Sequence, residues 1–351
     1  MIYCISLKVS PGFVAVSGDI PLLKLSFGKV THTLFRRSFE SELQIIKPFS
    51  LRVLPPNAFR LYEGGLRVRS QFQKNSRNIA NDSLLRKDLP LVSIITIVFN
   101  GRNYLEKTLL SVLTQSYPRI EYIVIDGGSS DGTQEILKRY DDHIDYWVSE
   151  PDKGISDAFN KGIQLSSGEV IGILNSDDWY EPNAIKTIVK VYQDHPDSII
   201  HGNIRFWNIQ GEPEYIFHGR DDIAHLRPSI NHPTVFVPRT VYEKNGLFLQ
   251  EFSKAMDFEW LVRSKRLGAS FIYINIVLAN MRRGGLSDKR WFESYCEAVK
   301  ARKLHGTSPL LNLYIFLKST SLTVGRNILE FLGLKKIILF YRSRISIGRK
   351  R

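Results

Sequence analysis

The amino-acid sequence predicts an α/β fold built on a doubly wound, mostly parallel sheet. Two observations point to this fold class. Between residues 91 and 193, segments with strand character alternate four times with segments of helical periodicity. The first of them, LVSIITIVF (91–99), is a nearly continuous run of apolar and β-branched residues, which is typical of a parallel strand covered on both faces.

The elements follow in order along the chain. In the first helix, Leu105, Leu109 and Val112 recur at helical spacing and would bury one stripe. The predicted strands are 91–99, 121–126, 145–150 and 169–174, and the predicted helices are 104–115, 133–140, 155–164 and 182–193. The alternation then fades into a smaller mixed part, with a predicted hairpin at 198–219, a helix at 257–268, a strand at 270–274 and a helix at 288–306.

Three regions are predicted along the chain. Residues 1–89 form an N-terminal extension, whose first 60 residues are either β-rich or poorly ordered, and which ends in a polar linker at 71–89. Residues 90–305 form the main domain, and residues 306–351 form a helical, basic, amphipathic tail.

The net charge of +13 is unevenly distributed. Residues 1–90 hold 14 Lys/Arg against 6 Asp/Glu, residues 91–297 hold 22 against 28, and residues 298–351 hold 12 against 1. An acidic centre between two basic ends argues against one continuous nucleic-acid groove, so no nucleic-acid partner is expected. This charge distribution is typical of a catalytic domain whose ends touch an anionic surface.

The sequence predicts a cytoplasmic protein. Lys8 and Pro11 interrupt the mildly apolar start, which does not resemble a signal peptide. No run of about 18 apolar residues occurs, so no transmembrane helix is expected. Cys4 and Cys296 lie far apart and form no CxxC pair, which argues against a disulfide framework and a zinc site.

Polar residues follow each of the four predicted parallel strands. In open α/β sheets, ligands bind at the carboxyl ends of the strands. One Asp at a strand end is more often a helix cap than a ligand, but four polar ends at one edge indicate a binding site. The four stretches are Phe99-Asn100-Gly101, DGGSSDGT (126–133), EPDKG (150–154) and Asn175-Ser176-Asp177-Asp178.

Two of these stretches suggest specific chemistry. Asp177 and Asp178 are adjacent carboxylates behind a buried strand, so at least one should have a raised pKa unless a cation neutralises it. Hard oxygen ligands suit Mg²⁺ or Mn²⁺, although Asp178 has the alternative of capping the next helix. Asp126 precedes two glycines that allow a ligand to approach, and is placed to accept a hydrogen bond from a nucleobase. The stretch is neither GxGxxG nor a P-loop.

Five motifs together resemble family 2 glycosyltransferases of the GT-A fold, of the type that builds bacterial cell-surface polysaccharides. They occur in the family's order and spacing over residues 91–300. The resemblance implies an inverting, hexosyltransferase-type enzyme (EC 2.4) that uses a divalent metal and a nucleotide-diphosphate donor, a UDP-sugar first of all. The motifs are TIVFNGRNYLEKTLLSVLTQSYP, EYIVIDGGSSDGT, SEPDKGISDAFNKGI, GILNSDDWY and MDFEWLVR.

The resemblance also implies a role for each matching donor-side residue. Asn175-Ser176-Asp177 matches the DxD motif, with Asp177 as the ligand of Mn²⁺ or Mg²⁺; Asn replaces the more common Asp at its first position, which changes the ribose contact. Asp126 would bind the nucleobase, and Asp157 would lie by the ribose and diphosphate. The implied nucleotide-binding residues are Thr96, Phe99, Asn100, Asp126, Lys153, Asp157, Asn160, Asn175 and Ser176.

The acceptor side matches less closely. Gly284 and Gly285, preceded by Arg283, resemble a mobile loop near the diphosphate, with an ordinary turn as the alternative. His232 lies in a segment that resembles part of the acceptor site, or is structural.

Asp257 matches the catalytic base of the family, with Glu259 as the second candidate. The two lie about 200° apart around a helix and should not serve one site. Alternatively, Asp257 is the helix N-cap and Glu259 a first-turn charge.

The expected reaction is sugar transfer to a saccharide or lipid-linked saccharide. A metal-dependent nucleotidyltransferase is the first alternative, but it would need a glycine- and lysine-rich loop in the first βα unit, which is absent. An inactive nucleotide-sugar-binding module is the second alternative.

Residues 327–351 mix Leu, Ile and Phe with Lys and Arg. This composition is typical of an interfacial helix on the inner face of an anionic membrane, or of a basic helix packed on the domain.

Overall fold

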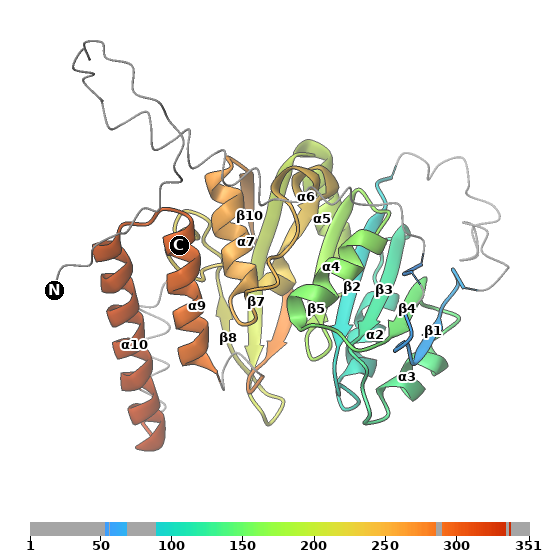
Figure 1. Ribbon diagram of the computed structural model, residues 1–351, viewed down its shortest axis with the longest axis horizontal. Helices are drawn as coiled ribbons and strands as arrows, with labels where there is room; N and C mark the ends of the chain where they lie inside the picture. The colour runs from blue at the N-terminus through green and yellow to red at the C-terminus, as the bar shows by residue number, and fades with distance from the viewer. Residues whose placement is uncertain (1–52, 56, 69–88, 286–289, 335–336, 338–351) are drawn as a thin grey trace, which may run out of the picture. The chain divides into compact units, whose positions relative to one another are not determined.

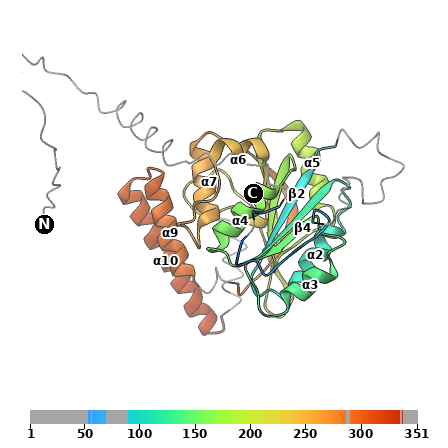
Figure 2. The same ribbon diagram turned by 45° about the vertical axis from the view of Figure 1, so that its right-hand side comes forward.

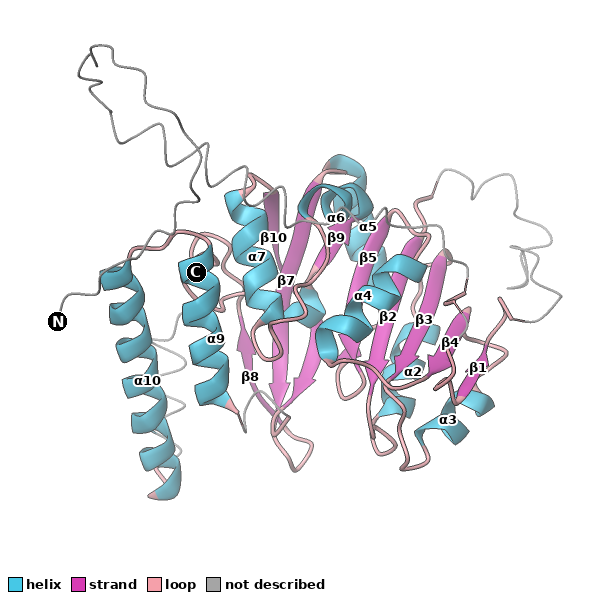
Figure 3. Cartoon of the chain, viewed as in Figure 1, coloured by secondary structure: helices cyan, strands magenta, loops and turns pink. Residues whose placement is uncertain are grey.

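The computed structural model describes residues 53–55, 57–68, 89–285, 290–334 and 337. Its centre is a ten-stranded sheet with the strand order β1-β4-β3-β2-β5-β9-β7-β10-β6, and β8 pairs with β7 beside this path (Figures 1 and 3). Most of the N-terminal extension, the linker at 71–88 and residues 338–351 of the predicted tail lie outside the described residues.

The parallel half of the sheet has the strands and helices that the sequence predicted. Every residue of β2 and β3 is buried, because helices cover both faces. Phe159 and Ile163 of α4 enter one apolar core, and Leu105 and Leu109 of α2 enter the other. The elements are β2 (Val92–Val98), α2 (Leu105–Leu113), β3 (Ile120–Asp126), α3 (Thr133–Arg139), β4 (Tyr146–Ser149), α4 (Ile155–Leu165), β5 (Val170–Asn175) and α5 (Ala184–Asp194). Between β5 and α5 lies β6 (Trp179–Tyr180), which was not predicted and which pairs antiparallel with β10 in the other half of the sheet.

The second half of the sheet is mixed, as expected. The predicted hairpin is formed by β7 and β8, which turn at Gln210 and Gly211, and β9 pairs antiparallel with both β5 and β7. Strand β10 runs to Arg282, eight residues beyond the predicted strand, because it pairs with β7 and with β6. The elements are β7 (Ser198–Trp207), β8 (Pro213–Phe217), η1 (His232–Thr234), β9 (Phe236–Pro238), α6 (Arg239–Asn245), α7 (Met256–Arg266), β10 (Ser270–Arg282), α9 (Trp291–Leu304) and α10 (Pro309–Phe331).

Strand β1 (Tyr62–Gly64) extends the edge of the sheet. It pairs antiparallel with β4, with Tyr62 opposite Ser149 and Gly64 opposite Trp147. A three-residue strand carries too little periodicity to be recognised in the sequence. Among the described helices, none has both the length and the apolar composition that a membrane crossing requires.

A buried ionic cluster joins α7 to the segment after α9. Arg263 lies 3.0 Å from Glu259, and His305 Nε2 lies 2.8 Å from the same carboxylate, with all three side chains almost fully buried. Arg263 also donates to the carbonyl oxygens of Asn245 and Leu247, at 2.7 and 2.8 Å. Burial would raise the pKa of Glu259, but the hydrogen bond of His305 and the charge of Arg263 outweigh it and lower that pKa. The cluster therefore holds Glu259 as a charged, structural group.

We expect Glu259→Gln to lower the free energy of unfolding by about 3 kcal/mol, because it leaves the Arg263 charge buried and unpaired. Urea unfolding followed by circular dichroism measures the loss. The matched control is Glu251→Gln, which breaks an exposed ion pair with Lys300 and should cost less than about 1 kcal/mol. Equal losses in the two variants would contradict the structural role of Glu259.

Candidate active site

The carboxyl ends of the four parallel strands lie at one edge of the sheet. Val98 is opposite Asp126 and Asp126 is opposite Ser149, while Ile97 is opposite Asn175. The predicted polar strand ends are therefore neighbours in space.

The loop after β3 closes against the ends of β2 and β4. A Cβ atom on Gly127 would lie 2.5 Å from Asp152 Oδ2 and 3.4 Å from the ring of Phe99, so a side chain at 127 would displace the Asp152 carboxylate. Asn100, with a φ of 52°, accepts from the backbone N–H of Ser130 at 3.0 Å. Phe99 is 66% exposed. An exposed aromatic ring beside a partly exposed carboxylate, Asp152, suits the stacking and hydrogen bonding of a nucleobase.

Asp126 is placed differently from the prediction. Its carboxylate has no exposed surface. It accepts from the N–H and the hydroxyl of Ser129, and from the Ser149 hydroxyl at 2.5 Å. Burial raises the pKa of Asp126, and these hydrogen bonds partly offset the rise. In this conformation Asp126 organises the loop at 127–130. The carboxylate that faces outward is Asp152, for which the sequence predicted no separate role.

Two further predicted nucleotide-binding residues lie away from this edge. Thr96 is fully buried, and its hydroxyl lies 3.0 Å from the hydroxyl of Tyr122 inside the core. Asn160 exchanges two hydrogen bonds with the backbone of Phe248, at 2.8 and 2.9 Å. Their placement corrects the expected base, ribose and diphosphate contacts: Thr96 is a core residue, and Asn160 joins α4 to the chain that leads into α7.

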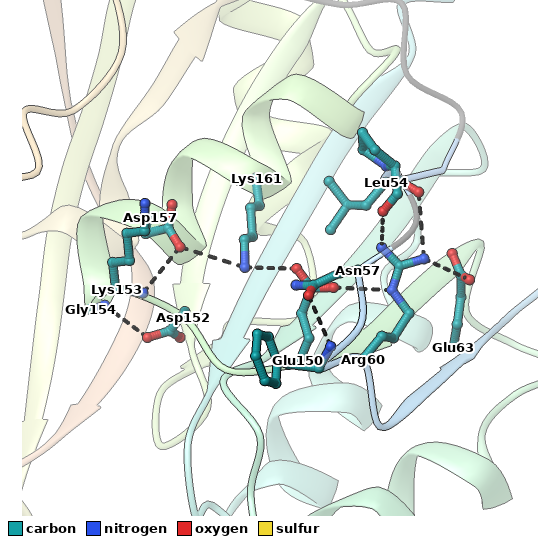
Figure 4. A network of polar contacts seen from close by, with 12 residues as sticks. Leu54, Asn57, Arg60, Glu63, Glu150, Asp152, Lys153, Gly154, Asp157 and Lys161 are labelled. Carbon is teal, nitrogen blue, oxygen red and sulfur yellow. Dashed lines mark hydrogen bonds and ion pairs between the residues drawn. The ribbon is translucent and has the colours of Figure 1, made fainter.

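A network of charges positions the loop between β4 and α4 (Figure 4). Lys161 bridges Asp157 and Glu150, with its Nζ 3.5 and 2.8 Å from their carboxylates, and Asp157 accepts from the Lys153 backbone N–H at 3.1 Å. Burial would raise the pKa of Glu150, but hydrogen bonds from Lys161 and Arg60 outweigh it and lower that pKa. The network therefore fixes the predicted residues Lys153 and Asp157.

Arg60 extends this network to the N-terminal segment, for which the sequence predicted no function. Its Nε lies 3.0 Å from Glu150, and its other nitrogens contact Glu63 and the carbonyl oxygens of Leu54 and Pro55. Arg60 and Glu150 are 90 residues apart, so no local pattern could have indicated the pair.

The adjacent carboxylates after β5 have separate roles. Asp178 is 1% exposed, and its carboxyl group accepts hydrogen bonds from Asn175 Nδ2 at 3.2 Å and from the backbone N–H of Arg282. It does not cap α5, because the N-cap of that helix is Asn183. Burial, then the charge of Asp177, raises the pKa of Asp178 well above its usual value. Asp177 is partly exposed and also has a raised pKa, because of burial. The predicted rise occurs at both carboxyls.

Asp177 lines a cavity of about 260 Å³. Lys107 Nζ lies 3.1 Å from the ring centroid of Trp179, and burial lowers the pKa of this lysine. The guanidinium of Arg282 lies 3.8 Å from the ring centroid of Tyr104, and its buried Nε has no hydrogen-bond partner among the described residues. The lining residues are Tyr104, Lys107, Thr108, Asp177, Trp179, Trp207, Ile209, Gln210, Gly211 and Arg282.

The loop after β10 borders this cavity. A Cβ atom on Gly285 would lie 3.6 Å from Asp177 Oδ2, so the predicted glycine loop does reach the predicted metal ligand. Arg283 turns away and pairs with Glu214 at 3.2 Å and with Glu330 at 3.7 Å. The arginine beside Asp177 is therefore Arg282, which corrects the expectation for Arg283. Gly284, with a φ of 91°, allows the chain to turn between them.

The number and type of metal ligands near Asp177 decide which divalent ion could bind there. The described part of the chain contains no cluster of three or more His, Cys, Asp or Glu side chains that could hold a metal ion. One carboxylate beside an open cavity instead suits Mg²⁺ or Mn²⁺, which accept one or two protein carboxylates and complete their shell with phosphate and water.

The acceptor-side residues lie around the start of α7. His232 stacks on Phe159 of α4 with 5.1 Å between ring centroids. Burial lowers the pKa of His232, and the charge of the nearby Asp257 carboxylate offsets this decrease only in part. Asp257 is partly exposed and is not the N-cap, which is Ala255; the N–H groups before α7 are instead bound by Glu297. Glu259 is fully buried, so the structure leaves Asp257 and His232 as the candidate bases.

Comparison with known proteins gives the relationships of this chain. Residues 93–253 match the model of glycosyl transferase family 2. A glycosyltransferase of Rickettsia typhi, uncharacterized, is 31% identical over 201 residues, which cover 53% of this chain and 61% of that protein. Glycosyltransferase GlyA of Streptococcus pneumoniae is 34% identical over 129 residues, 36% of this chain and 18% of that protein. The matches thus span less than two thirds of these relatives.

Two solved structures share the fold. TarS 1–349 of S. aureus in complex with UDP-GlcNAc is 16% identical, with a TM-score of 0.51 over 64% of this chain and 70% of that chain. The mannosyltransferase PcManGT of Pyrobaculum calidifontis, in complex with GDP-Man and Mn²⁺, is 18% identical, with a TM-score of 0.50 over 66% and 69%. The predicted GT-A fold class is confirmed by this likeness.

We expect Arg60→Met to loosen the loop between β4 and α4, because it removes one of the two cations that hold Glu150. The backbone amides of Lys153 and Gly154 should exchange hydrogen about tenfold faster or more, as the loss of a charge-assisted hydrogen bond implies. Hydrogen–deuterium exchange with mass spectrometry measures this. Arg139→Met, which breaks an exposed ion pair with Glu106, is the control. Unchanged exchange at 150–157 in Arg60→Met would reject the positioning role.

Proposed function

We propose that this protein, of which residues 93–253 match the model of glycosyl transferase family 2, is an inverting glycosyltransferase of hexosyltransferase type (EC 2.4). It would move a sugar from a nucleotide-diphosphate donor, a UDP-sugar first of all, to a saccharide or lipid-linked saccharide in polysaccharide biosynthesis. The enzyme would work in the cytoplasm, peripheral to the inner face of the membrane.

The observation that supports this most is the setting of Asp177. It is a partly exposed carboxylate at a strand end, in a cavity that also holds the cations Lys107 and Arg282. Cations beside a metal-binding carboxylate suit a diphosphate, whose negative charge grows as the sugar leaves. Mn²⁺ or Mg²⁺ at Asp177 would supply neutralisation of that charge. The relative from P. calidifontis is described with GDP-Man and Mn²⁺, in agreement with this class of donor and metal.

The nucleoside would lie between the ends of β2, β3 and β4. Phe99 offers an exposed ring for the base, and Asp152 offers a hydrogen-bond acceptor in place of the buried Asp126. Asn100 and Ser176 border the same edge, and Asn175 is held by Asp178. Lys153 and Asp157, fixed by the network around Glu150, would lie toward the ribose and diphosphate.

Inversion by a single displacement requires a base on the acceptor side. The Asp257 carboxylate would take the proton of the acceptor hydroxyl as the hydroxyl oxygen bonds to the anomeric carbon. The bond from that carbon to the diphosphate oxygen breaks, and the nucleoside diphosphate leaves with the bonding electrons. His232, kept neutral by its buried position, would border the acceptor.

Donor binding should depend on the metal. We expect UDP to bind about tenfold more tightly or more with Mn²⁺ than in EDTA, because the ion joins the diphosphate to Asp177. Isothermal titration calorimetry measures both affinities. Asp177→Asn should abolish the difference, while Asp194→Asn, an exposed position at the end of α5, should keep it. Equal affinities for UDP in Mn²⁺ and EDTA would reject the metal assignment.

The catalytic base can be tested by Asp257→Asn. The amide keeps the oxygen that accepts from the Phe258 N–H at 2.7 Å but loses basicity. We expect transfer to slow by about 100-fold or more, with donor affinity nearly unchanged. A panel of nucleotide sugars, assayed for release of UDP or GDP, identifies the donor for this measurement. Near-normal turnover would move the role to His232, and release of pyrophosphate instead would indicate a nucleotidyltransferase.

A further inference from the structure

Helix α10 is attached to the rest of the protein by a side that is largely polar, although it includes the buried Ile315. It packs against α9 (Figure 2). Asn312 accepts from Arg302 Nε at 2.7 Å and donates to the carbonyl of Val299 at 2.9 Å, and the hydroxyls of Thr323 and Tyr295 lie 2.7 Å apart. A surface helix normally presents its apolar stripe to the core and its polar side to water. In α10 this arrangement is reversed.

Large apolar side chains form a stripe along the outward side of α10. Leu310 is 83% exposed and Phe331 is 90% exposed, and the intervening members recur at intervals of three, four or seven residues. Such spacing keeps them on one side of a helix about 35 Å long. A row of exposed apolar side chains of this kind marks an interaction site. The stripe consists of Leu310, Leu313, Leu317, Val324, Ile328 and Phe331.

The charge of the sequence that follows α10 favours an anionic partner. Residues 335–351, which follow α10 in the sequence, hold seven Lys/Arg and no Asp or Glu. The same residues include Ile, Leu and Phe, the composition of a segment that lies in the interface of a bilayer. A second copy of the same face would bring an equal positive charge and be repelled, whereas anionic lipid headgroups complement it.

We propose that the outward stripe of α10 is a membrane-docking surface that lies in the interface of a bilayer containing anionic lipids. The stripe enters the boundary between headgroups and acyl chains, while the basic sequence that follows α10 supplies the attraction to anionic headgroups. This goes beyond the sugar-transfer chemistry, since docking needs neither donor nor acceptor.

The docking helix is also joined to the active-site loop. Glu330, in the last turn of α10, pairs with Arg283, which also pairs with Glu214 of β8. Arg283 is followed by Gly284 and Gly285, and Gly285 lies beside Asp177. Docking would therefore bring a lipid surface next to the loop at the cavity, where a lipid-linked acceptor would arrive; this last step rests on the proposed function.

Co-sedimentation of the full chain with phosphatidylcholine vesicles, with and without phosphatidylglycerol, tests the docking surface. We expect binding to the anionic vesicles about tenfold tighter or more than to the neutral ones, and weaker in high salt. Leu313→Glu/Leu317→Glu should lower binding about tenfold or more, because it introduces charge into the stripe. Both leucines are exposed, so the fold should be unaffected, which circular dichroism and thermal unfolding verify.

The matched control is Leu110→Glu/Ile276→Glu, which makes the same change at exposed apolar residues of α2 and β10 and should bind as the wild type does. Absence of binding to anionic vesicles, or equal binding by the two double variants, would overturn the proposal. So would a dimer, detected by light scattering, that Leu313→Glu/Leu317→Glu converts to a monomer, since the face would then belong to a second copy. None of these measurements requires enzymatic activity, so the docking proposal and the proposed reaction can be rejected independently of each other.

Discussion

The buried carboxylate of Asp178 constrains the whole edge of the sheet at which the candidate site lies. A buried carboxyl group is costly unless its oxygens are hydrogen-bonded. Asp178 meets this need with the side chain of Asn175 and the backbone N–H of Arg282, and the Thr108 hydroxyl lies 2.7 Å from its carbonyl oxygen. The ends of β5 and β10 and the helix α2 are thereby held together. Asp177, the next residue back along the chain, is left facing the cavity beside Arg282.

Helix α4 joins the two sides of the site. Its first turn carries Asp157, which is held by the charges that extend to Arg60, and whose other oxygen accepts from Gln250 at 3.1 Å. Ser156 and Asn160 bind the backbone of Phe252 and Phe248. The chain from 246 to 255 leads directly to Asp257. Since α4 contacts both the loop after β4 and this chain, the proposed donor side and the proposed acceptor side share one support.

The charge distribution along the chain corresponds to this division. The acidic middle supplies the carboxylates at the strand ends, of which Glu150 is neutralised by Arg60 and Lys161, and it also supplies Glu259 of α7, which pairs with Arg263. The sequence after 298 is basic and contains α10, whose large apolar side chains are mostly exposed. In the proposed docking, the basic end of the chain would attract an anionic surface, whereas charges within the domain are paired internally.

The sequence by itself determined the βα alternation, the shared edge of the strand ends and the unusual chemistry of Asp177 and Asp178. These follow from neighbouring residues, because periodicity and burial of a strand are local properties. Only the tertiary structure decided which polar groups face the site: Asp152 is outward and Asp126 is covered, and Asp257 is accessible while Glu259 is paired inside. Periodicity shows that an element has two faces, but which face meets the body depends on partners far along the chain, as Arg60 with Glu150 and the reversed helix α10 demonstrate.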